Sequence, residues 1–296
     1  MATSFRVGTA SWTDPTLLRA HFYPPAIKTA EGRLRFYAEH FDTVEVDSTY
    51  YALPNERNAA LWAERTPDGF TFNIKAFALL TQHAAEIRAL PPALQRQLSA
   101  DALRQRRVRR PPPELLALAF ELFRSALEPL RSAGKLGCVL LQFPPYFTAT
   151  PANAEYLLAC RDRLADLQLA VEFRHRSWLN GATEPTLALL REHQLSFVCT
   201  DVPEAPSIPH TPYVATCDTA YVRLHGHNRT AWFQRSATAA ERFKYLYADE
   251  ELRQAADRIR KLGGTRTTYV IFNNCYADYG VRNAATMKRL LTRDST

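Results

Sequence analysis

The segment Ala220-Tyr221-Val222-Arg223-Leu224-His225-Gly226 indicates the fold, because its apolar and polar side chains alternate. Successive side chains of a β-strand point to opposite faces, so the pattern predicts a strand with one apolar face and one charged face. Seven other short runs rich in β-branched or aromatic residues resemble it, at residues 6–10, 43–49, 71–76, 138–143, 169–174, 196–201 and 268–274. We therefore expect eight strands.

Segments with helical periodicity separate most of these runs. Apolar residues recur every three or four positions in residues 30–40, 55–65, 114–133, 154–166, 185–193, 241–262 and 284–291. A strand–helix unit repeated to a count of eight predicts an α/β fold, the TIM (β/α)8 barrel. The chain has 296 residues, so we expect a single domain over residues 1–296, with an insertion at about residues 100–113. A doubly wound sheet is the alternative, but the sequence has no GxGxxG turn.

The composition excludes several classes of protein. No apolar run approaches the roughly 18 residues of a membrane span, and the chain begins without the apolar segment of a secretory signal. The five cysteines are odd in number and form no CxxC pair, which is typical of reduced thiols. These features predict a cytoplasmic protein without a membrane partner. The motifs of P-loop hydrolases, zincin proteases and α/β-hydrolases are absent from the sequence.

The net charge of +7 comes mainly from one short region. Five arginines stand between positions 104 and 110, and they leave only +2 for the rest of the chain. We expect them to form a mobile, basic tip of the insertion. A non-catalytic nucleic-acid-binding protein is therefore one interpretation of the sequence, with phosphates contacting this run from Arg104 to Arg110.

The polar phase of the predicted strands gives the candidate site. In a barrel this phase points to the axis, and its members gather near the C-terminal ends of the strands, where the active sites of TIM barrels form. Buried charges are costly unless they are paired, hydrated or bound to a ligand. The pattern is therefore either a salt-bridge network that fills the barrel or a ligand site. Its members are Glu45, Asp47, Asn73, Lys75, Gln142, Glu172, Arg174, Asp201, Arg223, His225 and Asn273.

Seven motifs, in order along nearly the whole chain, resemble the DUF72 (YecE-like) family. They are VGTASW from Val7, VEVDSTYY from Val44, FTFNIK from Phe70, LQFPP from Leu141, VEFRHRSW from Val171, YVRLHG from Tyr221 and FNN from Phe272. The resemblance implies a TIM barrel and leaves the activity open. The chain departs from the family pattern at Asp47, where asparagine is usual, and at Thr81-Gln82-His83, which stands in place of a Thr-His pair.

Four residues are the catalytic candidates. Two inward carboxylates can act as general acid and base when their surroundings separate their pKa values. A lysine can bind an anion or form a Schiff base, and nearby carboxylates favour the first role because they oppose a lowered pKa. The alternative is that the glutamates are ion-pair partners of the arginines. The candidates are Glu45, Glu172, Lys75 and His225.

Ten further residues are expected to bind the substrate. Guanidinium forks suit carboxylate or phosphate groups, and aromatic rings after strands stack on a sugar or base unless they only cap the core. The expected ligand is a small, polar, anionic molecule such as a phosphorylated sugar or a nucleotide derivative. The residues are Trp12, Asp47, Tyr50, Asn73, Gln142, Arg174, Trp178, Asp201, Arg223 and Asn273.

A divalent-metal hydrolase or isomerase is the alternative enzyme. His225-Gly226-His227 has a chelating HxH spacing, and Glu45, Glu172 and Asp201 can supply oxygen ligands. Three nearby cations oppose a metal ion, so we expect an enzyme of open reaction class without a resident cofactor.

Overall fold

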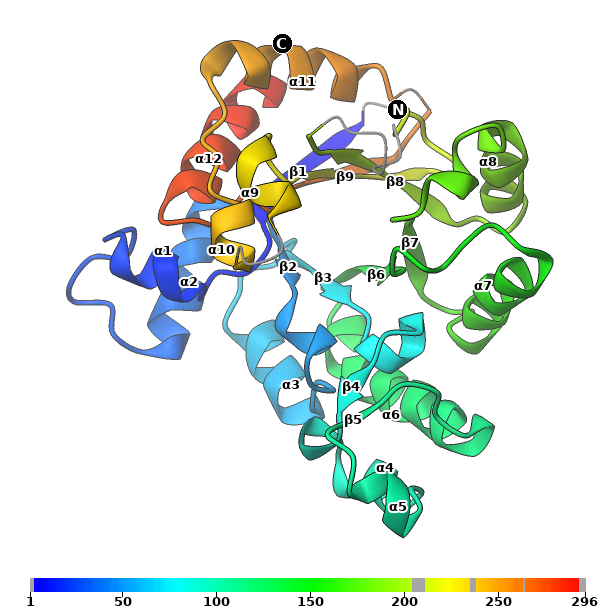
Figure 1. The fold of residues 1–296 in the computed structure, drawn as a ribbon. Helices are drawn as coiled ribbons and strands as arrows, with labels where there is room; N and C mark the ends of the chain where they lie inside the picture. The colour runs from blue at the N-terminus through cyan, green and yellow to red at the C-terminus, as the bar shows by residue number, and fades with distance from the viewer. Residues whose placement is uncertain (1–2, 204–210, 235–237, 263, 293–296) are drawn as a thin grey trace.

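Eight parallel strands form a TIM-like barrel in the computed structural model, which describes residues 3–203, 211–234, 238–262 and 264–292 (Figure 1). The strand order is β1-β10-β9-β8-β7-β6-β3-β2, and a bridge from Ala10 to Glu45 joins β1 to β2. All eight predicted strands are present, so the predicted fold class is confirmed. The strands are β1 (Ser4–Thr9), β2 (Thr43–Val46), β3 (Thr71–Lys75), β6 (Leu136–Gln142), β7 (Gln168–Glu172), β8 (Ser196–Asp201), β9 (Thr219–Leu224) and β10 (Thr267–Phe272).

The two faces of the strands are buried in different surroundings. The apolar phase, which includes Val44, Phe72 and Val222, packs in the main core between the strands and the helices. A second, smaller apolar cluster includes Leu140, Tyr221 and Ile271 from the opposite phase of their strands. The charged residues follow this phase toward the C-terminal ends of the strands, so the alternation predicted from sequence places them inside the barrel.

Helices surround the barrel, as Figure 1 shows. Thr29, Asn55 and Thr150 each stand at the start of a longer helix, and their side chains accept a backbone N–H of its first turn. The main helices are α2 (Ala30–His40), α3 (Glu56–Glu64), α6 (Pro113–Ser132), α7 (Pro151–Arg163), α8 (Thr183–Glu192), α11 (Asp249–Arg260) and α12 (Tyr279–Thr292). No helix of the described ranges is both long and apolar enough to cross a membrane.

One predicted helix is divided in two. Periodicity predicts a helix over residues 241–262, but the structure has α10 (Ala239–Arg242), a non-helical connection and then α11. The Glu251 carboxylate accepts the backbone N–H of Ala248 at 2.8 Å, which fixes the start of α11 at that point. The apolar and aromatic residues just before it belong to the connection.

Short elements follow several strands at their C-terminal ends. They shape the connections on the side of the barrel where the polar residues lie. They are α1 (Pro15–Arg19) after β1, η1 (Ser48–Tyr50) after β2, η2 (Ala78–Thr81) after β3, η4 (Arg176–Trp178) after β7 and α9 (Arg229–Phe233) after β9.

The insertion between β3 and β6 contains short helices and a two-stranded sheet, and the arginines of the expected basic tip at residues 104–110 are exposed. Its apolar residues Leu94, Leu98 and Val108 are buried, and Glu86 pairs with Arg88, Arg106 and Arg107. In Figure 1 it projects beyond α3 and α6. Its elements are the antiparallel pair β4 (Ala85–Glu86) and β5 (Arg107–Val108), with η3 (Ile87–Ala89), α4 (Pro92–Gln95) and α5 (Ala100–Leu103).

Candidate functional site

Arg223 joins the two inward glutamates into one buried cluster. Its Nε and Nη2 donate to the Glu45 carboxylate at 3.0 and 2.6 Å, and its Nη1 donates to Glu172 at 2.6 Å. Arg223 is 1% exposed and both glutamates are 0% exposed. One planar guanidinium from β9 therefore bridges carboxylates on β2 and β7, a geometry that suits the arginine fork.

The charges in this cluster stabilise one another. Burial alone lowers the pKa of Arg223, but the two glutamates outweigh it and raise that pKa. Burial alone raises the pKa of Glu172, but Arg174 and Arg223 outweigh it and hold that pKa below its ordinary value. Glu172 is therefore ionised at neutral pH and holds no proton to give as a general acid.

Tyr221 extends the cluster toward the barrel interior. Its hydroxyl donates to Glu45 at 2.9 Å, and the residue is fully buried. Tyr221 is not among the predicted site residues. It lies two positions before Arg223, however, so the alternation of strand side chains also points it into the barrel.

Arg174 and Gln142 lie beside this cluster at the ends of β7 and β6. The Nε of Arg174 lies 2.5 Å from Glu172 Oε1, and its Nη2 donates to the Gln142 carbonyl at 3.4 Å. The same Gln142 oxygen accepts from Arg223 at 3.1 Å. Arg174 Nη1 has no protein partner among the described residues, and 22% of the side chain is exposed. This nitrogen is free to contact a ligand.

His225 and Asn273 form a pair next to Arg174. The Asn273 amide and His225 Nδ1 lie 2.8 Å apart, and His225 Nε2 is 3.4 Å from Arg174 Nη2. Burial and the cations Arg174, Arg223 and Lys75 hold the pKa of His225 well below its ordinary value. The imidazole is therefore neutral and positions Arg174 and Asn273.

Lys75, at the end of β3, differs from the other site cations because no carboxylate lies within ion-pair distance of it among the described residues. Its Nζ lies 4.6 Å from the centre of the Tyr50 ring. Burial and Arg223 lower its pKa to about 8, although Glu45 and Glu172 oppose the shift. The sequence predicts that these carboxylates keep the pKa ordinary. That prediction is wrong, because the arginines offset the carboxylates.

Asp47 completes this side of the site. Asp47 follows the last residue of β2, and its charge interacts with that of Lys75 at the end of β3. Its carboxylate has no hydrogen-bond or ion-pair partner among the residues that the structure describes. Burial, and then Glu45, raise the pKa of Asp47 above its ordinary value. Asp47 is therefore a carboxyl group suited to proton transfer.

His83 is a further neighbour of Lys75 that the sequence analysis did not select. Its ring lies 5.2 Å from Tyr50, and its Nδ1 is 2.9 Å from the Thr81 hydroxyl. Burial, Lys75 and Arg174 lower its pKa to about 4, so the ring is neutral. The Thr-Gln-His departure from the family pattern was the signal for it.

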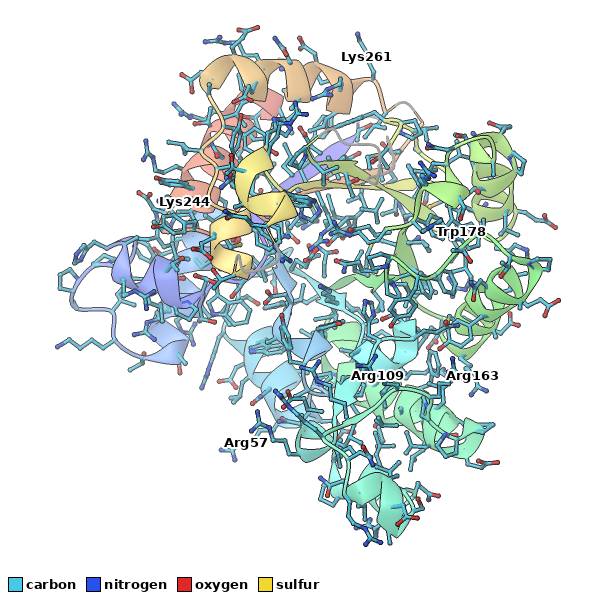
Figure 2. All side chains as sticks on the ribbon, in the orientation of Figure 1. Arg57, Arg109, Arg163, Trp178, Lys244 and Lys261 are labelled. Carbon is cyan, nitrogen blue, oxygen red and sulfur yellow. The ribbon has the colours of Figure 1, made fainter. Side chains whose placement is uncertain are left out.

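Asn73, Trp12 and Trp178 are predicted ligand residues that lie outside the cluster. Asn73 is fully buried with its amide bonded to Thr43 and to the backbone of Cys138. Trp12 is 8% exposed and packs on Trp62 and Phe72. Trp178 stacks on Phe147 and Phe173 and donates to the Phe147 carbonyl, on the α7–α8 side of the barrel in Figure 2.

Asp201, at the end of β8, belongs to a separate group. It contacts His227 Nε2 in a short hydrogen bond, and its other oxygen lies 3.6 Å from Arg258. His227 Nδ1 is 3.5 Å from Glu251 on α11. Hydrogen bonding to Asp201 raises the pKa of His227. The group ties the connection after β9 to α11.

The donor set does not suit the metal alternative. His225 faces Asn273 and Arg174, whereas His227 faces Asp201, so the two histidines do not converge. Glu45 and Glu172 are occupied by arginine. Within the described ranges, no three His, Cys, Asp or Glu side chains gather as metal ligands would.

Comparisons with known proteins agree with the sequence motifs. The family model described as "Protein of unknown function DUF72" matches residues 6–296. The chain is 29% identical over 294 residues to UPF0759 protein YunF of Bacillus subtilis, covering 96% of this chain and 94% of that protein. It is 36% identical over 63 residues to UPF0759 protein YecE of Escherichia coli K12, covering 21% of this chain and 23% of that protein.

Two solved structures share the fold over almost their whole length. A DUF72 family protein from Thermotoga maritima is 29% identical, with a TM-score of 0.76 over 97% of this chain and 99% of that one. A DUF72 family protein from Enterococcus faecalis is 24% identical, with a TM-score of 0.79 over 99% and 97%.

Proposed function

The chain belongs to the DUF72 family, and from its site we propose that it is an enzyme acting on a small, polar, anionic substrate at the C-terminal end of the barrel. One observation carries the proposal. Arg223 is ion-paired with two glutamates. Lys75 and Arg174 Nη1, in contrast, have no carboxylate or carbonyl partner among the described residues. A lysine without an ion-pair partner and an arginine with one open nitrogen, at the end of a barrel where active sites form, are suited to a carboxylate or phosphate.

The same geometry changes the assignment of proton transfer. Glu45 and Glu172 are ion-paired with arginine. We therefore assign them the role of holding the arginines in place, and not that of a general acid and base. Asp47 is open and has a raised pKa, and its charge interacts with that of Lys75. We assign the anion contacts to Lys75 and Arg174, and proton transfer to Asp47.

Removal of the open cations is expected to weaken anion binding. In calorimetry with inorganic phosphate, Lys75→Met and Arg174→Met should each reduce affinity about tenfold, because each removes a charge-assisted contact. Lys261→Met, at an exposed lysine on the surface (Figure 2), is the matched control and should bind as the parent does. Unchanged phosphate affinity in the double variant would contradict the site.

Turnover is tested separately from binding. The protein is incubated with a filtered extract of small metabolites, and the anions are compared by mass spectrometry before and after. Depletion of an anionic metabolite by the parent, and not by Asp47→Asn, is the expected result. Phosphate binding without any depletion would indicate a binding protein instead of an enzyme.

A second function is favoured by the surface next to this site. Tyr51 and Tyr146 are the most exposed large hydrophobic residues of the described ranges, at 68% and 63%. Burial raises the pKa of Tyr146, and the nearby Arg109 guanidinium opposes the shift. Arg109 lies on the insertion side of the barrel (Figure 2) and has no carboxylate partner within the described ranges. Exposed rings, one of them beside an arginine, suit single-stranded nucleic acid, whose bases stack and whose phosphates pair with guanidinium.

Nucleic-acid binding predicts separate effects of the rings and the charges. With a fluorescent oligothymidylate of about a dozen nucleotides, Tyr51→Ala and Tyr146→Ala should each weaken binding about tenfold. Neither should affect an abasic strand of equal length. Arg109→Ser with Arg110→Ser should reduce the salt slope by about 2. A complex that is insensitive to salt, or equal binding of a polyglutamate chain, would argue against this function.

A further inference from the structure

We propose that the Lys75 amine forms a Schiff base with the carbonyl carbon of its substrate, which is a small aldehyde or ketone carrying a carboxylate or phosphate. The inference rests on the proposed function and deepens it, because it names the substrate class of the same site. It begins from the position of Lys75 and from the partners of its neighbours.

The carboxylates nearest to Lys75 are held by other cations. Glu45 receives two nitrogens of Arg223 at 3.0 and 2.6 Å, and Glu172 lies 2.6 Å from Arg223 and 2.5 Å from Arg174. No salt bridge joins Lys75 to an acid in the described ranges. Its Nζ lies over the face of the Tyr50 ring, 4.6 Å from the ring centre. The amine is therefore not locked as an ammonium ion by a direct partner.

Burial makes this amine more nucleophilic than an ordinary lysine. Burial and Arg223 lower the Lys75 pKa to about 8, in spite of the Tyr50 ring and the carboxylates. At neutral pH the neutral amine is then on the order of a hundredfold more abundant than for a lysine with the reference pKa of about 10.4. Lys135 is different, since its Nζ donates to the Ala63 and Thr66 carbonyls at 2.6 Å.

Asp47 supplies the proton that imine formation requires. The neutral Lys75 nitrogen attacks the carbonyl carbon, and one of its protons passes to the carbonyl oxygen. The resulting carbinolamine hydroxyl takes the Asp47 proton and leaves as water, so that an iminium cation and an Asp47 carboxylate remain. Burial and Glu45 favour the protonated form of Asp47, and the new carboxylate would be attracted by the new cation at Lys75, whose charge already interacts with Asp47.

Arg174 accounts for the anionic group of the substrate. Its Nη1 is open while its Nε and Nη2 are fixed by Glu172 and Gln142. A carboxylate or phosphate on this nitrogen would leave the substrate carbonyl for Lys75, whose charge interacts with that of Arg174. A short 2-oxo acid or a phosphorylated aldehyde or ketone meets both requirements.

Reductive trapping tests the proposal. The whole protein is treated with glyoxylate and cyanoborohydride, and each lysine is followed by peptide mass mapping. Lys75 should be labelled at least about tenfold faster than Lys261 at pH 7, with a midpoint of labelling near pH 8. Asp47→Asn should slow labelling of Lys75 about a hundredfold. Lys75→Arg should abolish the fast phase, and Lys261→Arg should leave it unchanged.

The outcomes separate this inference from the proposed function. Equal labelling of Lys75 and Lys261 overturns the Schiff base, while phosphate binding that depends on Arg174 would still support the anion site. Fast labelling of Lys75 that phosphate suppresses supports both. Circular dichroism of Lys75→Arg and Asp47→Asn shows whether each variant is folded. In the unaltered protein, the labelling rates of Lys75, Lys135 and Lys261 can also be compared with one another, which needs no variant.

Discussion

Arg223→Met is expected to lower the free energy of unfolding by about 3–5 kcal/mol, because it leaves two buried carboxylates without their shared cation. Among the described residues, Glu45 would keep the Tyr221 hydroxyl, and Glu172 would keep Arg174 and the more distant His225. Such a loss is a large part of the stability of an ordinary domain. Urea unfolding followed by circular dichroism measures it. Arg253→Met, on exposed α11, is the matched control and should change stability by less than about 0.5 kcal/mol.

A second substitution, at Glu45, shows whether Arg223→Met destabilises the protein through an uncompensated buried charge or only through lost packing. Adding Glu45→Gln to Arg223→Met removes one uncompensated charge, so the double variant should be less destabilised than the sum of the single variants. The pKa of Glu172 is lowered in the folded protein, so its pairing stabilises the fold above its ordinary pKa and is lost as the pH falls through the folded value. The cost of Arg223→Met should therefore shrink below about pH 4. Strict additivity with no dependence on pH would contradict this account.

Gly8→Ala is expected to cost about 3 kcal/mol or more, because it introduces a methyl group into the junction between β1 and β2. A Cβ at Gly8 would lie 2.0 Å from the Thr43 carbonyl oxygen and 3.1 Å from the Thr43 side chain. The first of these contacts is with a backbone oxygen, so it can be relieved only if β1 and β2 move apart. The same strands are joined near Ala10 and Glu45, where the barrel closes. A large fall in Tm and in expression of folded protein is the expected result.

Gly280→Ala is the matched control for this prediction. A Cβ at Gly280, in α12, meets its nearest neighbour at 3.5 Å, which is an ordinary contact. Alanine also favours a helix over glycine, so stability should change by less than about 1 kcal/mol. Equal Tm values for Gly8→Ala and Gly280→Ala would show that the junction between β1 and β2 adjusts to the extra methyl group.

The strand count and the inward face were predictable because they depend on local order in the sequence. Alternation has a period of two, so Val222 and Leu224 identify one face, and Arg223 and His225 the other, without any knowledge of distant residues. The same reasoning placed Lys75, Glu45 and Glu172 inside the barrel. It did not show that Trp178 and Asn73 lie apart from the arginine–glutamate cluster, because position after or within a strand does not tell how far along the barrel axis a side chain lies.

The sequence by itself therefore determined the barrel, the charges in its interior and the end at which they gather. The tertiary structure decided which charges pair. Arg223 contacts both glutamates because the curvature of the sheet brings β2, β7 and β9 around one axis, and no local pattern records that approach. Once Arg223 is occupied, Lys75 and Asp47 remain open, so the reactive groups of the site follow from pairing across the barrel. The insertion likewise depends on contacts between residues apart in the sequence, since β4 pairs with β5 and Leu94 and Val108 are buried.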